Sequence, residues 1–241
     1  KVAADAFTDA PGNGNTVSNT FAWTYDATGP TMTITSADLS NGGAFNAATV
    51  LTFTSNEDTA DFVVGDITVG NGALSLFQSS TSKVYTATFT PTGEGAATID
   101  VASPKFTDAS GNANSAAVQF AYTHDTTAPT MTITSTTVSS GDTSNDGTVA
   151  YVFTSNSPTA NFIETDITET GGSWSAFTAV TTVKYTATFT PSGQGATSVL
   201  VGAGTFTDAA GNANTVSNTF AWTYDSVGPT MTITSTTVSS G

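Results

Sequence analysis

An internal repeat of about 100 residues constrains the fold of this chain more than any other feature of its sequence. Three motifs recur in the same order and at the same spacing: Pro-Thr-Met-Thr-Ile-Thr-Ser at 30–36, 129–135 and 229–235, Phe-Thr-Asp-Ala at 7–10, 106–109 and 206–209, and Tyr-Thr-Ala-Thr-Phe-Thr-Pro at 85–91 and 185–191. The coincidence of three motifs at one period predicts copies of one structural unit.

The period divides the chain into four segments. Two complete repeats, 30–128 and 129–228, lie between the C-terminal part of a preceding repeat (1–29) and the first strand of a following one (229–241). Neither flanking fragment is long enough to bury a core of its own. We therefore expect the sequence to be a window cut from a longer tandem array. A subunit whose partial repeats are completed by neighbouring chains is the alternative.

Each repeat is predicted to be all-β. Threonine is the commonest residue, and its β-branched side chain suits a pleated surface better than a helix. Between turn-forming residues, seven segments alternate apolar and polar side chains, and in the first repeat they are 31–36, 49–55, 66–70, 73–77, 83–90, 96–102 and 118–123. Seven strands in about 100 residues predict an immunoglobulin-like β-sandwich, here without a disulfide because the chain has no cysteine. An eight-stranded jelly roll fits this length less well.

The charge of the chain excludes several classes of partner. Nineteen acidic residues against four lysines give a formal net charge of -15. So few cations cannot neutralise a run of phosphates, which argues against binding to nucleic acid or to an anionic membrane surface. No apolar run approaches the roughly 18–20 residues of a membrane span, so we expect no membrane insertion in this segment.

The residues needed for most catalytic sites are scarce, and we predict that the chain is not an enzyme. The single histidine, His124, occupies a position held by Tyr25 and Tyr224 in the other copies, which favours packing on an aromatic face over a role as a base. Without cysteine and with one histidine, the chain lacks the ligands of a typical zinc site and the residues of most Cys-His or Ser-His-Asp arrangements.

The order of several motifs resembles that of bacterial Ig-like repeats. The residues that carry the resemblance are Phe-Thr-Ser at 53–55, Asp-Ile-Thr at 66–68, Tyr-Thr-Ala-Thr-Phe-Thr-Pro at 85–91, Phe-Thr-Asp-Ala-Ser-Gly-Asn at 106–112 and Asp-Thr-Thr-Ala-Pro at 125–129. Such repeats occur in large secreted adhesins and other microbial surface proteins. The resemblance implies a β-sandwich, an extracellular or cell-surface location, and calcium at junctions between domains.

Sandwich topology also predicts where the acidic residues gather. The loops that follow the second, fourth and sixth strands should lie at the pole where the first strand begins, next to the linker that enters the repeat. For the first junction this brings together Asp26, Glu57, Asp58, Asp61, Asp108, Asn112 and Asn114. Calcium takes six to eight hard oxygen ligands of this kind. The sequence therefore predicts a calcium site at this junction.

The second junction is predicted to be poorer in acidic residues than the first. The second gathers Asp125, Asp208, Asn212 and Asn214, but its loop at 156–161 has lost all three acids, so we expect the first junction to bind calcium more tightly. Asp9, with Asn13 and Asn15, belongs to the matching loop of the preceding repeat, and Asp225 to the following junction.

Two features have a competing structural interpretation. Asp-x-x-Gly-Asn is also an ordinary turn, in which the Asp side chain bonds its own backbone. The cluster Asp142 to Asp146 lies at the opposite pole and is better explained as a solvated turn. Trp23, Trp174 and Trp222 could stack on sugars, but their positions favour core packing.

We predict from these features a segment of an extracellular rod that works as a structural extender or fibre-forming element. Its partners would be the neighbouring repeats of the same chain, with self-association into a fibre left open. A carbohydrate- or protein-binding Ig-like module, in an adhesin or as an accessory domain of a secreted enzyme, is the alternative. The near-identity of the loops in the two repeats argues against that alternative.

Overall fold

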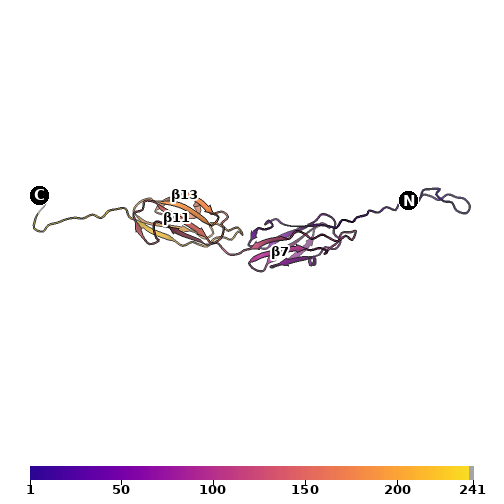
Figure 1. Ribbon diagram of the computed structural model, residues 1–241, viewed down its shortest axis with the longest axis horizontal. Helices are drawn as coiled ribbons and strands as arrows, with labels where there is room; N and C mark the ends of the chain where they lie inside the picture. The colour runs from indigo at the N-terminus through magenta and orange to yellow at the C-terminus, as the bar shows by residue number, and fades with distance from the viewer. Residues whose placement is uncertain (239–241) are drawn as a thin grey trace.

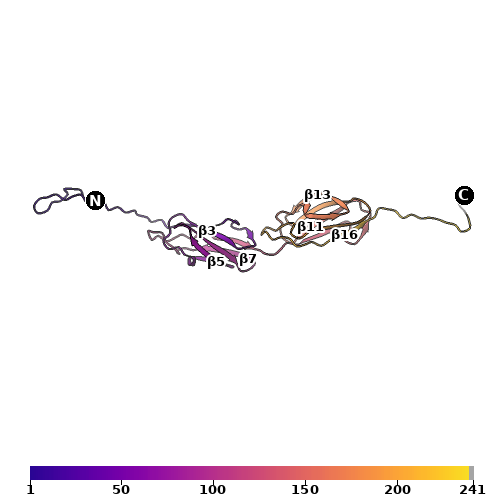
Figure 2. The ribbon, with the colours of Figure 1, turned by 180° about the vertical axis from the view of Figure 1, so that it is seen from behind.

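Two β-sandwiches lie end to end in an elongated molecule, and each is formed by one repeat (Figure 1). The computed structural model describes residues 1–238. The first and last of these residues lie toward opposite ends of the molecule, as the view from behind also shows (Figure 2).

The first sandwich contains two four-stranded sheets, ordered β1-β3-β6-β5 and β2-β8-β7-β4. Its elements are β1 (Met32–Ser36), β2 (Ala44–Phe45), β3 (Thr49–Ser55), the 3₁₀ turn η1 (Val64–Asp66), β4 (Ile67–Gly70), β5 (Gly72–Ser79), β6 (Val84–Pro91), β7 (Gly95–Val101) and β8 (Phe120–His124). All neighbours pair antiparallel except β2 and β8, which pair parallel.

The second sandwich repeats this topology, with sheets ordered β9-β11-β14-β13 and β10-β16-β15-β12. Its elements are β9 (Met131–Ser135), β10 (Thr143–Ser144), β11 (Val149–Ser155), η2 (Glu164–Asp166), β12 (Ile167–Thr170), β13 (Gly172–Thr181), β14 (Lys184–Pro191), β15 (Gly195–Val201) and β16 (Phe220–Tyr224). Neither η1 nor η2, the helices of residues 1–238, has the length or apolar character that crossing a membrane requires.

The prediction of an all-β, immunoglobulin-like sandwich is confirmed, with local differences in the strands and their ends. The two-residue strand β2 was not expected, because so short a segment shows no alternation and is defined only by its pairing with β8. The third predicted strand, 66–70, begins one residue late, at Ile67, because Val64–Asp66 form a 3₁₀ turn. The last predicted strand, 118–123, begins two residues late, at Phe120.

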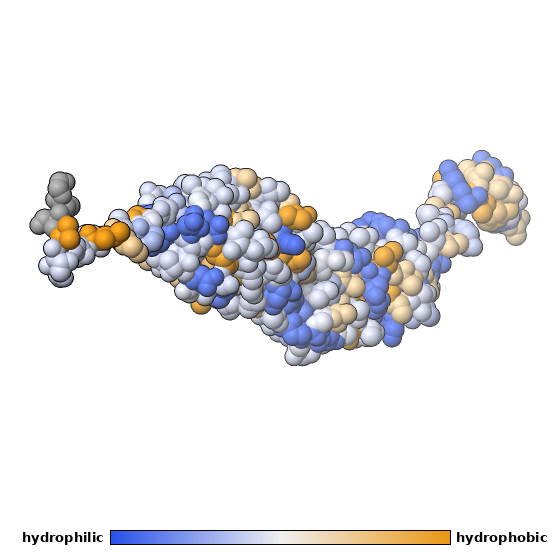
Figure 3. Space-filling view, turned by 60° about the vertical axis from the view of Figure 1, so that its left-hand side comes forward, coloured by the Kyte–Doolittle hydropathy of each residue, from blue (hydrophilic) through white to orange (hydrophobic). Residues whose placement is uncertain are grey.

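Alternation along the strands places one apolar face of each sheet in the core. Along β3 the side chains alternate strictly, so that Leu51 and Phe53 are fully buried while Val50 is exposed. Phe62, in the loop between β3 and β4, packs edge-on against Tyr85 of β6 and Phe106 of the β7–β8 loop, with ring centroids 5.0 Å apart in both pairs. The outer faces carry mainly threonine and serine, so the space-filling surface is largely of intermediate hydropathy (Figure 3).

One pair of core residues differs between the repeats in a way that changes hydrogen bonding. In the second repeat the buried Trp222 donates its indole Nε1–H to the hydroxyl of Tyr151 at 3.0 Å. In the first repeat these positions are Tyr122 and Leu51, and the buried Tyr122 hydroxyl has no hydrogen-bond partner among residues 1–238. Burial raises the pKa of both tyrosines, that of Tyr151 to about 12.

The flanking segments lack the strands that would pair with them. Phe21 and Trp23, which match buried residues of β8 and β16, are largely exposed. The β-pairing within 1–29 is limited to the isolated bridge between Thr8 and Gly14. The predicted strand in 229–241 is not formed over 229–238, where Met231 and Ile233 are exposed, and 239–241 lie outside the described residues. A strand sequence alone does not make a strand without a partner to bond.

Candidate metal centre at the first junction

Three loops of the first repeat meet at the pole where β1 begins. They are the loops between β3 and β4, between β5 and β6, and between β7 and β8. Thr59 forms an isolated bridge with Asp108 and donates its N–H to the carbonyl of Ser82 at 2.9 Å, and Ala60 donates to the carbonyl of Thr107. The predicted convergence of these loops is confirmed.

The β7–β8 loop is fixed by its own polar side chains. Asn114, nearly fully buried, accepts from the N–H groups of Lys105 and Phe106 and donates to the carbonyls of Ala102 and Ser115. Its amide is therefore satisfied within the loop and offers no oxygen to a metal. In the second repeat Asn214 makes the equivalent contacts and is occupied in the same way.

Asp108 forms the turn that the Asp-x-x-Gly-Asn pattern predicts. Its Oδ1 accepts from the N–H groups of Ser110 and Asn112, both at 2.8 Å, and its Oδ2 accepts from Asn112 Nδ2 at 2.9 Å. Gly111 completes the turn at a φ of 86°, where side chains are strained. The side-chain hydrogen bond from Asn112, supported by the backbone donors, holds the pKa of the Asp108 carboxyl below its usual value.

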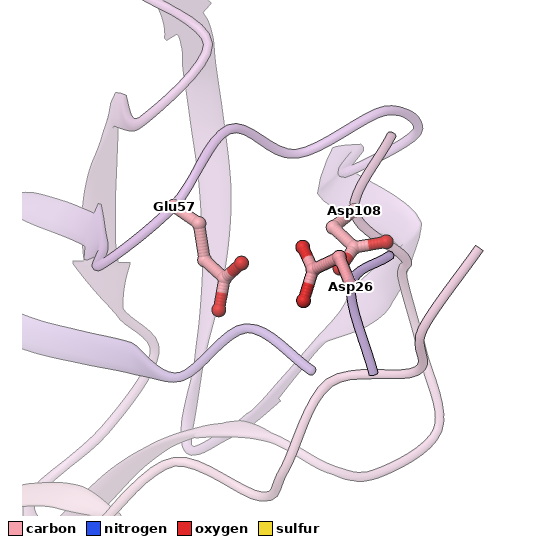
Figure 4. A group of neighbouring side chains, drawn as sticks. All are labelled: Asp26, Glu57 and Asp108. Atoms are coloured by element: carbon pink, nitrogen blue, oxygen red, sulfur yellow. The ribbon is translucent and has the colours of Figure 1, made fainter. Parts of the chain in front are cut away.

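The carboxylates of Asp26, Glu57 and Asp108 face one another at this pole (Figure 4). One oxygen from each lies within 4.8 Å of the others, and the residues come from the entering linker, the β3–β4 loop and the β7–β8 loop. They line a crevice of about 170 Å³ together with Asp58, Ala109 and Ser110. Among residues 1–238 this is the one group of three possible His, Cys, Asp or Glu ligands found so close together.

The remaining predicted residues of the first junction have other contacts. Asp58 lines the crevice, but its carboxylate also accepts from the hydroxyl of Ser82. Asp61 lies outside the crevice lining and accepts from the N–H of Thr107 at 2.7 Å. Asn112 donates to the carbonyl of Asp26 at 3.2 Å, which ties the linker to the loop without a metal.

The second junction keeps the linker contact and lacks the carboxylate trio. Asn212 donates to the carbonyl of Asp125 at 2.8 Å and to Asp208 Oδ2 at 3.0 Å, as Asn112 does in the first junction. Ser157 and Pro158 replace Glu57 and Asp58. Asp125 and Asp208 are therefore not joined by a third carboxylate among the described residues.

A contact across the two sandwiches reinforces this second junction. Asn46, which follows β2 of the first repeat, donates its amide to Asn212 Oδ1 at 3.0 Å, and Asp125 N–H donates to the carbonyl of Phe45. Asn46 is not among the residues predicted for this junction. Its recurrence as Asn145 at the same place in the second repeat was the available signal.

Asp9 and Asp225, the acidic residues predicted for the outer junctions, are each bonded within a local turn. Asp9 accepts from Asn13 N–H at 2.8 Å and from its Nδ2 at 3.0 Å, and Asn15 bonds the backbone of Phe7. This loop keeps its turn without a sandwich around it, so the turn is encoded locally. Asp225 accepts from the N–H of Val227 in a linker turn, and neither Asp9 nor Asp225 belongs to a carboxylate cluster in the described residues.

A family model described as bacterial Ig-like domain matches residues 26–123 and 125–224. The chain belongs to the bacterial Ig-like domain family. The boundary between the two matches falls at the second junction, so each sandwich is one bacterial Ig-like domain.

Two bacterial proteins are among the solved structures to which the chain shows similarity. InvD of Yersinia pseudotuberculosis is 18% identical, with 84% of this chain and 60% of InvD covered and a TM-score of 0.41. Invasin, described as a bacterial integrin-binding protein, is 17% identical, with 70% and 36% covered and a TM-score of 0.37. The chain thus spans less than two thirds of the length of either. No curated protein sequence matches the chain significantly.

The other residues considered for chemistry pack as parts of the two Ig-like domains. Trp222 is buried, and Trp174 packs against the core and donates its indole N–H to Glu169. His124 is half-buried at the end of β8, with Nδ1 2.9 Å from the carbonyl of Gly93. Asp142 accepts from the N–H of Ser139 in a surface turn.

Proposed function

We propose that these bacterial Ig-like domains form an extracellular structural spacer whose first junction is stiffened by calcium. The carrying observation is the approach of Asp26, Glu57 and Asp108 to within 4.8 Å from three separate segments. The linker supplies one carboxylate and the domain supplies two, so an ion held by all three would join linker to domain.

The donor set fits calcium in its chemistry. Calcium prefers carboxylate and carbonyl oxygens, accepts irregular geometry and completes its six to eight ligands with water. The pKa of Asp108 lies below its usual value, so this carboxylate is ionised at neutral pH. Without a cation, three like charges at this distance repel one another and loosen the linker. A bound calcium ion would therefore neutralise this repulsion and hold the linker against the domain.

The second junction also supports a stiff spacer, because amide hydrogen bonds hold its linker in place of carboxylates around an ion. Its linker is held by the amide of Asn212 and by Asn46 of the preceding domain. Pro129 then begins the next domain four residues after Asp125, and its fixed φ limits the motion of this short joint. We expect calcium to bind more weakly there because Glu57 and Asp58 have no acidic counterparts.

Isothermal titration of the full chain with calcium chloride tests the proposal. We expect one tight site per chain, with an affinity lowered at least about tenfold in Glu57→Gln, because one charged ligand is worth about 1.4 kcal/mol or more in such a site. Asp61→Asn is the matched control. It removes one charge nearby, and the second domain shows that Asn161 keeps the same hydrogen bond to Thr207.

The control variant should bind calcium as the unmodified chain does. Absence of binding heat, or equal affinity in Glu57→Gln and the unmodified chain, would refute calcium at this junction. The assignment to the Ig-like family would not change.

A further inference from the structure

In the second domain one asparagine bridges the seam between the two sheets, the place where the edge strand β9 of one sheet runs beside the segment that enters β16 of the other. Asn218, just before β16, accepts from the N–H of Ile133 at 2.7 Å and donates to the carbonyl of Ile133 at 3.0 Å. Ile133 lies in β9, the edge strand of the opposite sheet. The carboxamide of Asn218 thus bonds both main-chain groups of Ile133, the N–H and the C=O, which point outward at the centre of this edge strand.

The first domain lacks this closure. Its matching residue is Val118, which is 83% exposed and has no hydrogen-bonding side chain. Ile34 is paired opposite Phe53 just as Ile133 is paired opposite Phe153. Antiparallel pairs alternate between bonded and non-bonded positions, so the main-chain N–H and C=O of Ile34 also point outward. No hydrogen bond joins them to a group across the seam among residues 1–238.

A crevice opens beside these free groups in the first domain. It has a volume of about 290 Å³, and its apolar lining is Ile34, Leu39 and Phe120. The main chain on the other side of the seam already has a partner, because Asn41 donates to the carbonyl of Gln119, just before β8, and accepts from the N–H of Ala121 in β8. The open hydrogen-bonding capacity therefore lies on β1 alone.

We propose that this notch, formed by the β1 edge at Ile34 and the adjoining crevice, binds an extended peptide segment of a partner protein. The peptide's main-chain amide would bond Ile34, and an apolar side chain would enter the crevice. The second domain identifies the chemistry, since the group that occupies the same edge there is an amide that both donates and accepts. Strand addition to a sheet edge combines main-chain bonds with side-chain pockets in this way.

Capped leucine, N-acetyl-leucine methylamide, is a minimal probe because it carries one apolar side chain between two peptide amides. We expect its addition to the ¹⁵N-labelled full chain to shift the Ile34 amide resonance saturably. The Ile133 amide, already bonded to Asn218, should not respond.

Two variants exchange the seam residues of the two domains. Val118→Asn introduces the closing amide and should weaken probe binding at Ile34 about tenfold, which corresponds to about 1.4 kcal/mol. Asn218→Val should create a response at Ile133. The remaining amide resonances of each domain report whether the variant has kept its fold, and Val118→Asn on the surface is not expected to disturb it.

Several outcomes would overturn the proposal. Equal shifts at Ile34 and Ile133 in the unmodified chain, or unchanged probe binding in Val118→Asn, would show non-specific contact. A saturable shift with N-acetylglucosamine and none with capped leucine would assign the notch to acetamido sugars. Dimerisation that Val118→Asn abolishes, without probe binding, would show that a second copy occupies the edge.

Discussion

Removing a single hydroxyl should have opposite effects in the two domains. Tyr122→Phe deletes a buried oxygen that has no partner among the described residues, whereas Tyr151→Phe deletes the acceptor of the Trp222 indole N–H. Both changes remove the same atom from a side chain that is at most 3% exposed. The difference in sign therefore depends only on hydrogen bonding.

The magnitudes follow from the cost of an unsatisfied buried group, which is about 1–3 kcal/mol. Tyr122→Phe removes such a group and leaves a very small void, so we expect the first domain to gain about 1 kcal/mol. Tyr151→Phe creates one at Trp222, so the second domain should lose about 1–3 kcal/mol. For domains of this size, 1 kcal/mol corresponds to about 4–8 °C in Tm.

Native-state hydrogen exchange on the full chain separates the two domains. The amides of Ile99 in β7 and Val199 in β15 are fully buried and lie in the central region of their sheets, so each reports the unfolding free energy of its own domain. Tyr122→Phe should slow exchange at Ile99 about fivefold and leave Val199 unchanged. Destabilisation of the first domain, or changes of the same sign in both domains, would refute the reasoning.

Three further predictions concern other contacts. Asn214→Ala should destabilise the second domain by about 3 kcal/mol or more because it breaks the four hydrogen bonds of a buried side chain. Asn15→Ala breaks three counterparts of these bonds outside any sandwich, so it should leave both melting transitions in place. The second domain should lose stability as the pH rises from about 10 to 12, because the unfolded Tyr151 ionises before the folded one, whose pKa is about 12; pH-dependent denaturation should show less of this loss in Tyr151→Phe. Asn212→Ala should broaden the distribution of angles between the domains, seen by small-angle scattering as a lower maximum dimension, and an unchanged scattering curve would contradict its role at the joint.

Much of the fold could be predicted because the repeat supplies its own alignment. Tyr85, Ala87 and Phe89 alternate in both copies, and all three are buried in β6. The β7–β8 loop was predictable for a different reason, since Asp9 and Asn13 form the same turn without any surrounding sandwich.

The candidate site was predictable only in outline. Strand order places Glu57, Asp61 and Asp108 at one pole, but loop sequence does not say which carboxylates turn inward. Asp61 caps the backbone of Thr107, a role that asparagine fills equally well in the second domain. The contact of Asn46 with Asn212 depends on how two domains meet, and no pattern within one repeat encodes that geometry.

The distance between two spin labels across each junction tests the calcium-stiffened spacer most directly. The chain has no cysteine, so cysteines introduced at the exposed positions Ala22, Gln78 and Thr178 are labelled specifically. Ala22 lies in the entering linker, four residues before Asp26, so its label follows the part of the linker that the ion would hold. On adding calcium, we predict that the distance distribution between positions 22 and 78 narrows, while that between 78 and 178, across the amide-bonded second junction, stays the same. A distribution between positions 22 and 78 that is equally broad with calcium and with chelator would contradict the central claim.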